Sequence, residues 1–273
     1  MTTVALVDSG LGLLGFADAL LRARPDLDLV VSMDPDHMPW GTRSVESVTE
    51  RVLAGVDAAL PLHPDAVVIA CNTGSVRALS TVRGRLEPAV PVIGTVPAIR
   101  PAVATGGPVA VWATTSTTGS PYQRDLILRF ADGVAVQEVA CVGLAEAVES
   151  GDLARVDTAV AAAVAATRPD TAAVVLGCTH FPLVRDRIVA ALPPGVTVLD
   201  STAAVARQTL VRLDGCSSPV TGVVGGRVGG GLTVLLSGRA GRLPAAVTAY
   251  AAGRRVLAAA TDGPLGQPEH APA

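Results

Sequence analysis

Two cysteines in this chain stand at equivalent positions, each at the end of a short apolar run. Cys71 follows residues 67–70 and Cys178 follows residues 174–177, and two polar residues come directly after each cysteine. A thiol at such a position can serve as a nucleophile or, once deprotonated, as a base. Two thiols on opposite sides of one substrate could remove a proton from one face of a carbon and return a proton to the other, which inverts a stereocentre.

Acidic and imidazole side chains could tune these thiols. The candidates are Asp8, Glu149 and His180. A helix is predicted after each cysteine, and we expect its N-terminus to lower the pKa of the thiol from an ordinary value of about 8.5. A single cysteine of this kind would instead favour acyl transfer through a thioester, with His180 as the only nearby histidine to assist it.

The apolar runs before the cysteines predict buried strands, and the segments after them predict helices at residues 75–86 and 182–192. In open α/β sheets, ligands bind where the carboxyl end of a strand meets the start of a helix. The two cysteines lie far apart in a chain of 273 residues, which is long enough for two modest domains. The sequence therefore predicts an α/β fold with two pseudo-symmetric, open parallel-sheet domains that face a central cleft.

The remaining segments repeat this alternation of strands and helices. Further strands are predicted at residues 4–7, 27–33, 90–95, 109–113, 135–140, 196–201 and 232–237. Further helices are predicted at residues 16–21, 44–60, 122–130, 153–166 and 245–260. A glycine-rich stretch at residues 223–231 is typical of a flexible connection.

The first strand ends in Asp8-Ser9 and is followed by a G-x-G-x-x-G pattern at residues 10–15. One interpretation is a dinucleotide fingerprint, because Asp34 lies about where a ribose-binding acid would be. A second is that the glycines let backbone N–H groups approach a small carboxylate while Asp8 and Ser9 face the reacting centre. A third is a tight turn capped by the Asp-Ser pair. The fingerprint explains neither cysteine segment, which favours the second interpretation.

Two polar loops offer binding groups. In the first, Trp40 offers an aromatic ring as a pocket wall, Gly41 a free backbone N–H and Thr42 a hydroxyl. The hydroxyl-rich loop at residues 114–118 follows a predicted strand and could either line an anion site or cap the next helix. His37 and His63 are interpreted as solvated loop histidines.

Composition argues against several classes of function. The net charge of −3 without a basic block argues against a nucleic-acid partner. The chain has no lysine, so it can neither form the Schiff base of pyridoxal phosphate chemistry nor complete a Walker A loop. Its four cysteines lack CxxC spacing, which argues against a zinc site or a disulfide framework and leaves Cys141 and Cys216 as small buried hydrophobic residues. Without a membrane-spanning apolar run or a signal peptide, the expected location is the cytoplasm.

Several motifs follow one another in the chain: Asp8-Ser9-Gly10, Pro39-Trp40-Gly41-Thr42, Cys71-Asn72-Thr73, Val92-Ile93-Gly94, Gly177-Cys178-Thr179-His180-Phe181-Pro182-Leu183 and Leu199-Asp200-Ser201. With these motifs in this order, the chain resembles the cofactor-independent glutamate racemases of the aspartate/glutamate racemase superfamily. The resemblance runs from residue 4 to about residue 205, and the two cysteine motifs are its most specific part.

The resemblance implies two α/β domains around a cleft, with the C-terminal segment returning to the first domain. We therefore expect a first domain of residues 1–97 and 206–260, a second of residues 98–205, and a disordered tail at 261–273. The resemblance also implies that Cys71 and Cys178 are the acid/base pair, assisted by Asp8, Glu149 and His180. Residues that match amino-acid-binding positions are Asp8, Ser9, Trp40, Gly41, Asn72, Thr73, Thr179 and His180, with Thr114 and Thr117 placed beside them.

The implied activity is interconversion of L- and D-glutamate by a homodimer without cofactor or metal, supplying D-glutamate for peptidoglycan. The chain departs from the family at Leu13, where a second glycine is common, at Trp40, where tyrosine is common, and at Gly74, where alanine is usual. These changes leave the proton-transfer pair intact but leave open whether aspartate or another acidic amino acid is the substrate.

Three other hypotheses remain. One is an isomerase or decarboxylase of small dicarboxylates from the same superfamily, which could manage with one cysteine. The second is a nucleotide-binding protein built on the glycine pattern. The third is a racemase relative kept for binding or regulation, against which the two intact cysteines argue.

Overall fold

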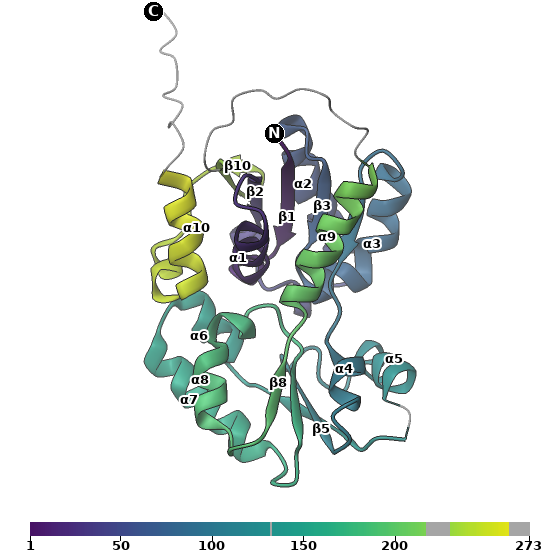
Figure 1. Cartoon of the computed structure of the whole chain (residues 1–273), viewed down its shortest axis with the longest axis vertical. Helices are drawn as coiled ribbons and strands as arrows, with labels where there is room; N and C mark the ends of the chain where they lie inside the picture. Colours follow the sequence, from purple (N-terminus) through teal and green to yellow (C-terminus); the bar gives the residue numbers. More distant parts are fainter. Residues whose placement is uncertain (132, 217–229, 262–273) are drawn as a thin grey trace, which may run out of the picture.

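The computed structural model describes residues 1–131, 133–216 and 230–261, so most of the predicted flexible connection and the tail from residue 262 lie outside the described residues. The strands form two sheets, one above the other in Figure 1. The first has the order β10-β9-β2-β1-β3-β4 and consists of β1 (Thr3–Asp8), β2 (Asp28–Met33), β3 (Ala66–Ile69), β4 (Val92–Gly94), β9 (Leu232–Leu236) and β10 (Arg239–Ala240). The second has the order β6-β5-β7-β8 and consists of β5 (Val109–Ala113), β6 (Val136–Ala140), β7 (Ala173–Leu176) and β8 (Thr197–Leu199).

The two sheets repeat one topology. In each, the first strand along the chain lies between the second and the third, and the fourth pairs with the third, as β2-β1-β3-β4 and β6-β5-β7-β8 show. These neighbours all pair in parallel, and β9 joins the first sheet parallel to β2. The predicted fold class is confirmed, with the antiparallel edge strand β10 as an unpredicted addition.

Helices cover both faces of each sheet. On the first sheet, one face carries α1 (Leu13–Ala23), α9 (Thr202–Cys216) and α10 (Ala251–Thr261), and the other carries α2 (Val45–Ala59) and α3 (Asn72–Leu86). On the second, one face carries α4 (Ile99–Val103) and α5 (Pro121–Phe130), and the other carries α6 (Leu144–Ser150), α7 (Leu153–Ala166) and α8 (Arg185–Ala191). Short 3₁₀ helices are η1 (Pro35–His37), η2 (Trp40–Thr42), η3 (Leu60–Leu62), η4 (Phe181–Val184) and η5 (Ala245–Ala249). Within the described ranges, no helix combines the length and apolarity needed to cross a membrane.

Strand alternation explains how the core is built. Val4 and Leu6 of β1 pack on the α1 side of the sheet, whereas Ala5 and Val7 pack on the side of α2 and α3. β7 repeats this alternation between the α7 side and the α4 side. The cluster on the α1 side continues through α6, α7 and α8 onto the second sheet, so the two sheets share one continuous core.

Several helices begin where the local sequence favours a cap. The Ser44 side chain accepts from the Ser47 N–H at the start of α2, and the Ser120 side chain accepts from the Gln123 N–H at the start of α5. The Asp152 carboxylate accepts from two N–H groups in the first turn of α7. Such caps satisfy backbone donors that have no partner within the helix.

Helix boundaries differ from the prediction at both cysteines. α3 begins at Asn72, three residues earlier than predicted, so Cys71 is its N-cap. After Cys178 the chain first forms η4, which has proline in its first turn, and α8 begins only at Arg185. α9 is a helix that the apolar pattern does not predict, because packing on α1 rather than a strong amphipathic repeat stabilises it.

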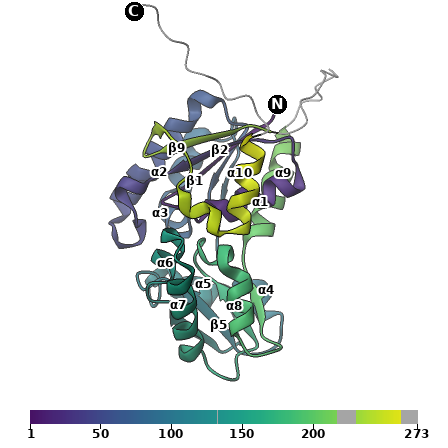
Figure 2. The same ribbon diagram turned by 90° about the vertical axis from the view of Figure 1, so that its left-hand side faces the viewer.

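The chain passes between the sheets after β4 and again after β8. At these passages the hydroxyl of Thr95 lies 2.9 Å from that of Ser201, within hydrogen-bond distance. The chain then places β9 beside β2 and α10 against α1 (Figure 2). Just before α10, the hydroxyl of Tyr250 donates a hydrogen bond to the carbonyl of Val148 in α6, so the C-terminal segment contacts both halves.

Candidate active site

The carboxyl ends of four strands meet at one cavity. Asp8 ends β1 and Cys71 follows β3, at the point where the strand order of the first sheet reverses. Thr114 follows β5 and Cys178 follows β7, at the equivalent point of the second sheet. Open parallel sheets bind ligands at such reversal points. Here the two points border the same cavity, which has a volume of about 180 Å³.

All of the site residues predicted from the sequence line this cavity. They are Asp8, Ser9, Trp40, Gly41, Cys71, Asn72, Thr73, Thr114, Thr117, Glu149, Cys178, Thr179 and His180. They come from the ends of β1, β3 and β7 with the residues that follow them, from the loops after β2 and β5, and, for Glu149, from α6. The structure therefore brings the two cysteine segments together across one cavity.

On the first side of the cavity, the thiol of Cys71 interacts with the carboxylate of Asp8. This carboxylate is completely buried and accepts hydrogen bonds from the Ser9 N–H at 2.6 Å and the Thr179 hydroxyl at 3.2 Å. Burial raises the pKa of Asp8 to about 6, although the nearby His180 acts in the opposite direction.

The same surroundings raise the pKa of Cys71 well above its ordinary value. Burial of the thiol is the main cause, and the negative charge of Asp8 adds to it. The expected net lowering of this pKa is therefore wrong for Cys71, although the residue is the N-cap of α3 and the Gly74 N–H in the first turn acts in the lowering direction. Loss of water around a buried thiolate outweighs the stabilisation that the end of the helix offers.

On the other side, a thiol, an imidazole and a carboxylate form a chain. Sγ of Cys178 lies 3.8 Å from Nδ1 of His180, and Nε2 of the same ring lies 2.8 Å from Oε2 of Glu149. Burial opposes the charged ring, but hydrogen bonds to Cys178 and Glu149 raise the pKa of His180 well above its ordinary value. For Glu149, burial acts upward and is outweighed by the bond to His180, so its pKa is lowered. Both shifts favour an imidazolium paired with a carboxylate.

The rest of the cavity wall is uncharged except for Glu146. Hydroxyl groups come from Ser9, Thr73 and the loop at residues 114–117. Asn72 donates its side-chain N–H to the carbonyl of Gly177 at 2.7 Å, while its buried Oδ1 has no hydrogen-bond partner in the described part of the chain. Among the described residues that line the cavity there is no arginine. A ligand's carboxylates would therefore meet hydroxyl and N–H donors rather than guanidinium groups.

The glycine pattern at residues 10–15 is filled by the protein's own side chains. The N–H of Leu11 donates a hydrogen bond to Glu149 at 2.8 Å. A Cβ atom at Gly10 would lie 2.5 Å from Oε2 of Glu149, and one at Gly12 would lie 2.3 Å from Oγ1 of Thr179. The glycines are needed because the second half approaches the loop this closely. The loop therefore has no room for the pyrophosphate of a dinucleotide. Its backbone binds the carboxylate of Glu149 instead.

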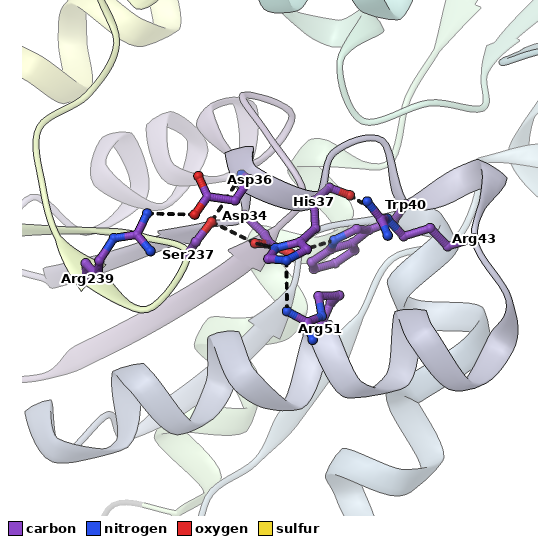
Figure 3. A network of polar contacts seen from close by, with 8 residues as sticks. All are labelled: Asp34, Asp36, His37, Trp40, Arg43, Arg51, Ser237 and Arg239. Atoms are coloured by element: carbon purple, nitrogen blue, oxygen red, sulfur yellow. Dashed lines mark hydrogen bonds and ion pairs between the residues drawn. The ribbon is translucent and has the colours of Figure 1, made fainter.

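Asp34, considered as a ribose-binding acid, has other partners. Its carboxylate accepts hydrogen bonds from the side chains of His37, Trp40 and Ser237 (Figure 3). His37 keeps 37% of its side chain exposed, in line with its interpretation as a solvated histidine, and its ring also lies between Asp34 and Arg51. His63 is exposed, as predicted.

The cavity is also lined by residues that the sequence analysis does not name as site residues: Met38, Pro39, Thr42, Thr115, Ser116, Cys141, Gly143, Ala145, Glu146 and Gly177. Glu146 could have been found, because it precedes Glu149 by three residues and so shares a face of α6. Ser116 lies in the hydroxyl-rich loop that the sequence offered as an anion site, but its contact with the other half was not predicted: a Cβ atom at Gly41 would lie 2.3 Å from its Oγ. Cys141 is buried, as predicted, and also borders the cavity.

Comparison with known proteins decides the family. The family described as Asp/Glu/Hydantoin racemase matches residues 16–209. The chain is 40% identical over 220 residues to the glutamate racemase of Salmonella typhimurium, an alignment that covers 76% of this chain and 75% of that protein. This chain belongs to the Asp/Glu/Hydantoin racemase family. The resemblance seen in the sequence motifs is thereby confirmed.

Solved racemases of this family share the fold. The Escherichia coli glutamate racemase, in complex with L-glutamate and the activator UDP-MurNAc-ala, has a TM-score of 0.73 and 29% identity, covering 91% of this chain and 92% of that one. The Thermus thermophilus glutamate racemase, in complex with beta-chloro-D-alanine, has a TM-score of 0.68 and 27% identity, covering 94% and 93%. Of the positions where this racemase-family chain departs from common family residues, Leu13 is completely buried outside the cavity lining and Trp40 lines the cavity.

Proposed function

We propose that this chain interconverts L-glutamate and D-glutamate by proton transfer between Cys71 and Cys178, without a cofactor. One observation carries the mechanism: two thiols from different sheets line one cavity, and each contacts its own proton partner, Asp8 for Cys71 and His180 for Cys178. An enzyme that uses a single thiol would not need a second thiol with its own proton partner in the same cavity. Relatives named glutamate racemase at 40% identity support glutamate as the substrate.

The reaction balances without oxidation or reduction. One thiolate removes the proton from Cα, the electron pair spreads into the α-carboxylate, and the opposite thiol delivers a proton to the other face. The two sulfurs thereby exchange protonation states, and the reverse reaction restores them. Asp8 accepts the Cys71 proton when that residue must act as the base, and His180 is the proton partner that lies beside Cys178.

The uncharged groups of the cavity suit an acidic amino acid. The unpartnered Oδ1 of Asn72 is an acceptor for the substrate ammonium group. Hydroxyls of Ser9 and Thr73 from the first half, and of residues 114–117 from the second, are donors for the two carboxylates. Because the donors come from both halves, substrate is held between the two thiols.

The test is proton NMR of L-glutamate with the purified protein in D₂O, without added cofactor. We expect loss of the α-proton signal and appearance of D-glutamate in a chiral assay. Exchange with aspartate or another acidic amino acid but not with glutamate would leave the chemistry standing and change the substrate. If no amino acid exchanges, the racemase proposal falls, and release of CO₂ from small dicarboxylates becomes the next measurement.

We further propose a cytoplasmic homodimer that supplies D-glutamate for peptidoglycan. The family relationship supports the metabolic role. Growth of a D-glutamate auxotroph on expression of this chain, and loss of that growth with a Cys71→Ala variant, tests the role. Size-exclusion chromatography with light scattering tests the dimer, and a molar mass of one chain would contradict it.

Replacing Glu149 by glutamine tests the chain that runs to Cys178. Because the Glu149 carboxylate helps to raise the pKa of His180, its loss makes the imidazolium deprotonate at lower pH. We expect kcat to fall by about 10-fold to 100-fold. We also expect the alkaline limb of the pH profile to move to lower pH. Glu50→Gln, an exposed change on α2, serves as the control. An unchanged alkaline limb in Glu149→Gln would contradict the role of the pair.

A further inference from the structure

Trp40 separates the substrate cavity from a second cavity. The residue is buried and lines both the large cavity and a smaller one of about 60 Å³ behind it. The smaller cavity is also bordered by Asp34, His37, Arg51 and Ser237. The indole ring is therefore a wall with space on two sides, and something other than close packing all round must keep it in place.

The first restraint on this ring is the carboxylate of Asp34, which is 8% exposed. Its Oδ2 accepts from the indole N–H of Trp40 at 3.1 Å, and its Oδ1 accepts from the Ser237 hydroxyl at 2.8 Å and lies 2.9 Å from Nδ1 of His37. Burial acts to raise the pKa of Asp34, but these hydrogen bonds outweigh it and lower the pKa. The group is thus an ionised acceptor that joins three segments of the chain (Figure 3).

Ser237 reaches Asp34 from an unfavourable backbone conformation. It lies between β9 and β10 with a φ of 45°, in the left-handed region that glycine adopts far more readily. Its N–H donates to the carbonyl of Met33 at 2.7 Å, which holds the turn against the end of β2. Strain of this kind persists where the surrounding contacts demand the side chain, and here the hydroxyl supplies a hydrogen bond to Asp34 that glycine would lack.

The second restraint is the absence of a side chain at Gly74, in the first turn of α3. A Cβ atom there would lie 3.2 Å from Cζ3 of Trp40, and equally close to side-chain atoms of Ile69 and Val52. An added methyl group would have to displace one of these three neighbours. All three side chains belong to one buried cluster, but the ring also borders the two cavities, which Ile69 and Val52 do not, so the ring is the neighbour with space to move into.

We propose that Asp34 and Gly74 are positioning residues that hold Trp40 as the wall of the substrate cavity and so determine which acidic side chain fits. The assignment rests on the proposed racemase function. Neither residue is part of the cavity lining, so each acts through the indole ring. The hairpin of β9 and β10 contributes through Ser237, although it lies outside the substrate cavity.

Asp34→Asn tests the first restraint. Asparagine has one acceptor oxygen, so it presents an N–H group either to the indole N–H or to the His37 and Ser237 pair. We expect KM for glutamate to rise by about tenfold while kcat stays within about twofold, because the reacting thiols are untouched. Arg239→Gln, a change in β10 of the same hairpin that breaks an exposed ion pair to Asp36 in η1, is the matched control and should change neither constant. Equal falls in kcat and kcat/KM with an unchanged KM would overturn the proposal.

Gly74→Ala tests the second restraint. We expect the ratio of kcat/KM for glutamate and aspartate to change by about fivefold or more, because the displaced ring alters the wall of the substrate cavity. An unchanged ratio would overturn the proposal.

Fluorescence separates this proposal from the racemase proposal. Trp112→Phe leaves Trp40 as the single tryptophan, and its emission needs no turnover. We expect Asp34→Asn and Gly74→Ala to shift this emission and Arg239→Gln to leave it unchanged. Ser237→Ala, which removes one of three donors to Asp34, provides a milder variant if Asp34→Asn does not fold. Unchanged emission in Asp34→Asn, Gly74→Ala and Ser237→Ala overturns the positioning role whether or not glutamate is the substrate.

Discussion

Cys71→Ala and Cys178→Ala are each expected to abolish racemisation, with kcat lowered by at least about a thousandfold. Each thiol serves one face of the substrate, so a chain with one thiol can remove a proton from only one enantiomer. That thiol can still return deuterium to the face from which it took the proton. We therefore expect one variant to exchange the α-proton of L-glutamate without inversion and the other to exchange that of D-glutamate.

This complementary pattern is measured by proton NMR of each enantiomer in D₂O, with a chiral assay for inversion. The double variant serves as the control and should exchange neither enantiomer. Exchange of both enantiomers by a single variant would show that a different group acts as the second base. Retention of racemisation by either single variant would remove that thiol from the mechanism.

Asp8→Asn is expected to lower kcat/KM by about a hundredfold at neutral pH. The buried carboxylate accepts the proton of Cys71 only while it is ionised, and its pKa is raised to about 6. Activity of the unchanged chain should therefore fall as the pH drops through about 6, since the carboxylate becomes protonated. The pH profile of the residual activity of Asp8→Asn should lack this fall near pH 6. An acid limb near pH 6 that survives in Asp8→Asn would assign it to another group.

The same substitution should stabilise the fold. The pKa of Asp8 is higher in the folded chain than its ordinary value of 3.8, so the folded state binds more protons between these two values and loses stability as the pH rises through them. At pH 8, we expect Asp8→Asn to be more stable by about 2 to 4 kcal/mol, and the difference should vanish as the pH falls towards 4.

Thermal unfolding at several pH values measures this difference. Asp26→Asn, at an exposed aspartate, should change stability by less than about 0.5 kcal/mol at every pH. If Asp8→Asn unfolds at a lower temperature than the unchanged chain at pH 8, the charge of Asp8 stabilises the folded state. If Asp8→Asn is more stable but less active than the unchanged chain, the ionised carboxylate that activity needs lowers the stability of the fold.

The strand-end positions of Asp8, Cys71, Thr114 and Cys178 could be predicted from local pattern and one rule of topology, whereas most of the other binding residues were implied by the family resemblance. β1, β3, β5 and β7 are apolar runs followed by polar or thiol side chains, and parallel strands gather such ends at one edge of a sheet. The repeated order of the two sheets places Asp8 beside Cys71 and Thr114 beside Cys178. No distance between the halves was needed to name these groups.

What could not be predicted depends on contacts between distant segments. The hydrogen bond from Ser237 to Asp34 joins residues 203 positions apart, and no spacing in the chain signals it. The pKa of Cys71 was expected to fall because the sequence shows the adjacent helix, whereas burial and the carboxylate of Asp8 appear only in the folded chain. The glycines also depend on such contacts. In the sequence, Gly10 and Gly12 match a nucleotide-binding loop, whereas in the folded chain they make room for the side chains of Glu149 and Thr179.

The uncharged donors of the cavity have a consequence for ionic strength. Glutamate carries two carboxylates, yet the described lining offers them hydroxyl and N–H groups, and its only cationic side chain, His180, is already paired with Glu149. Dissolved ions weaken attraction between full charges over about 10 Å, but they hardly affect short hydrogen bonds inside a cavity. KM should therefore stay nearly constant as salt is added, and simple anions such as sulfate should compete poorly. Recognition here depends on the geometry of donors rather than on opposite charge.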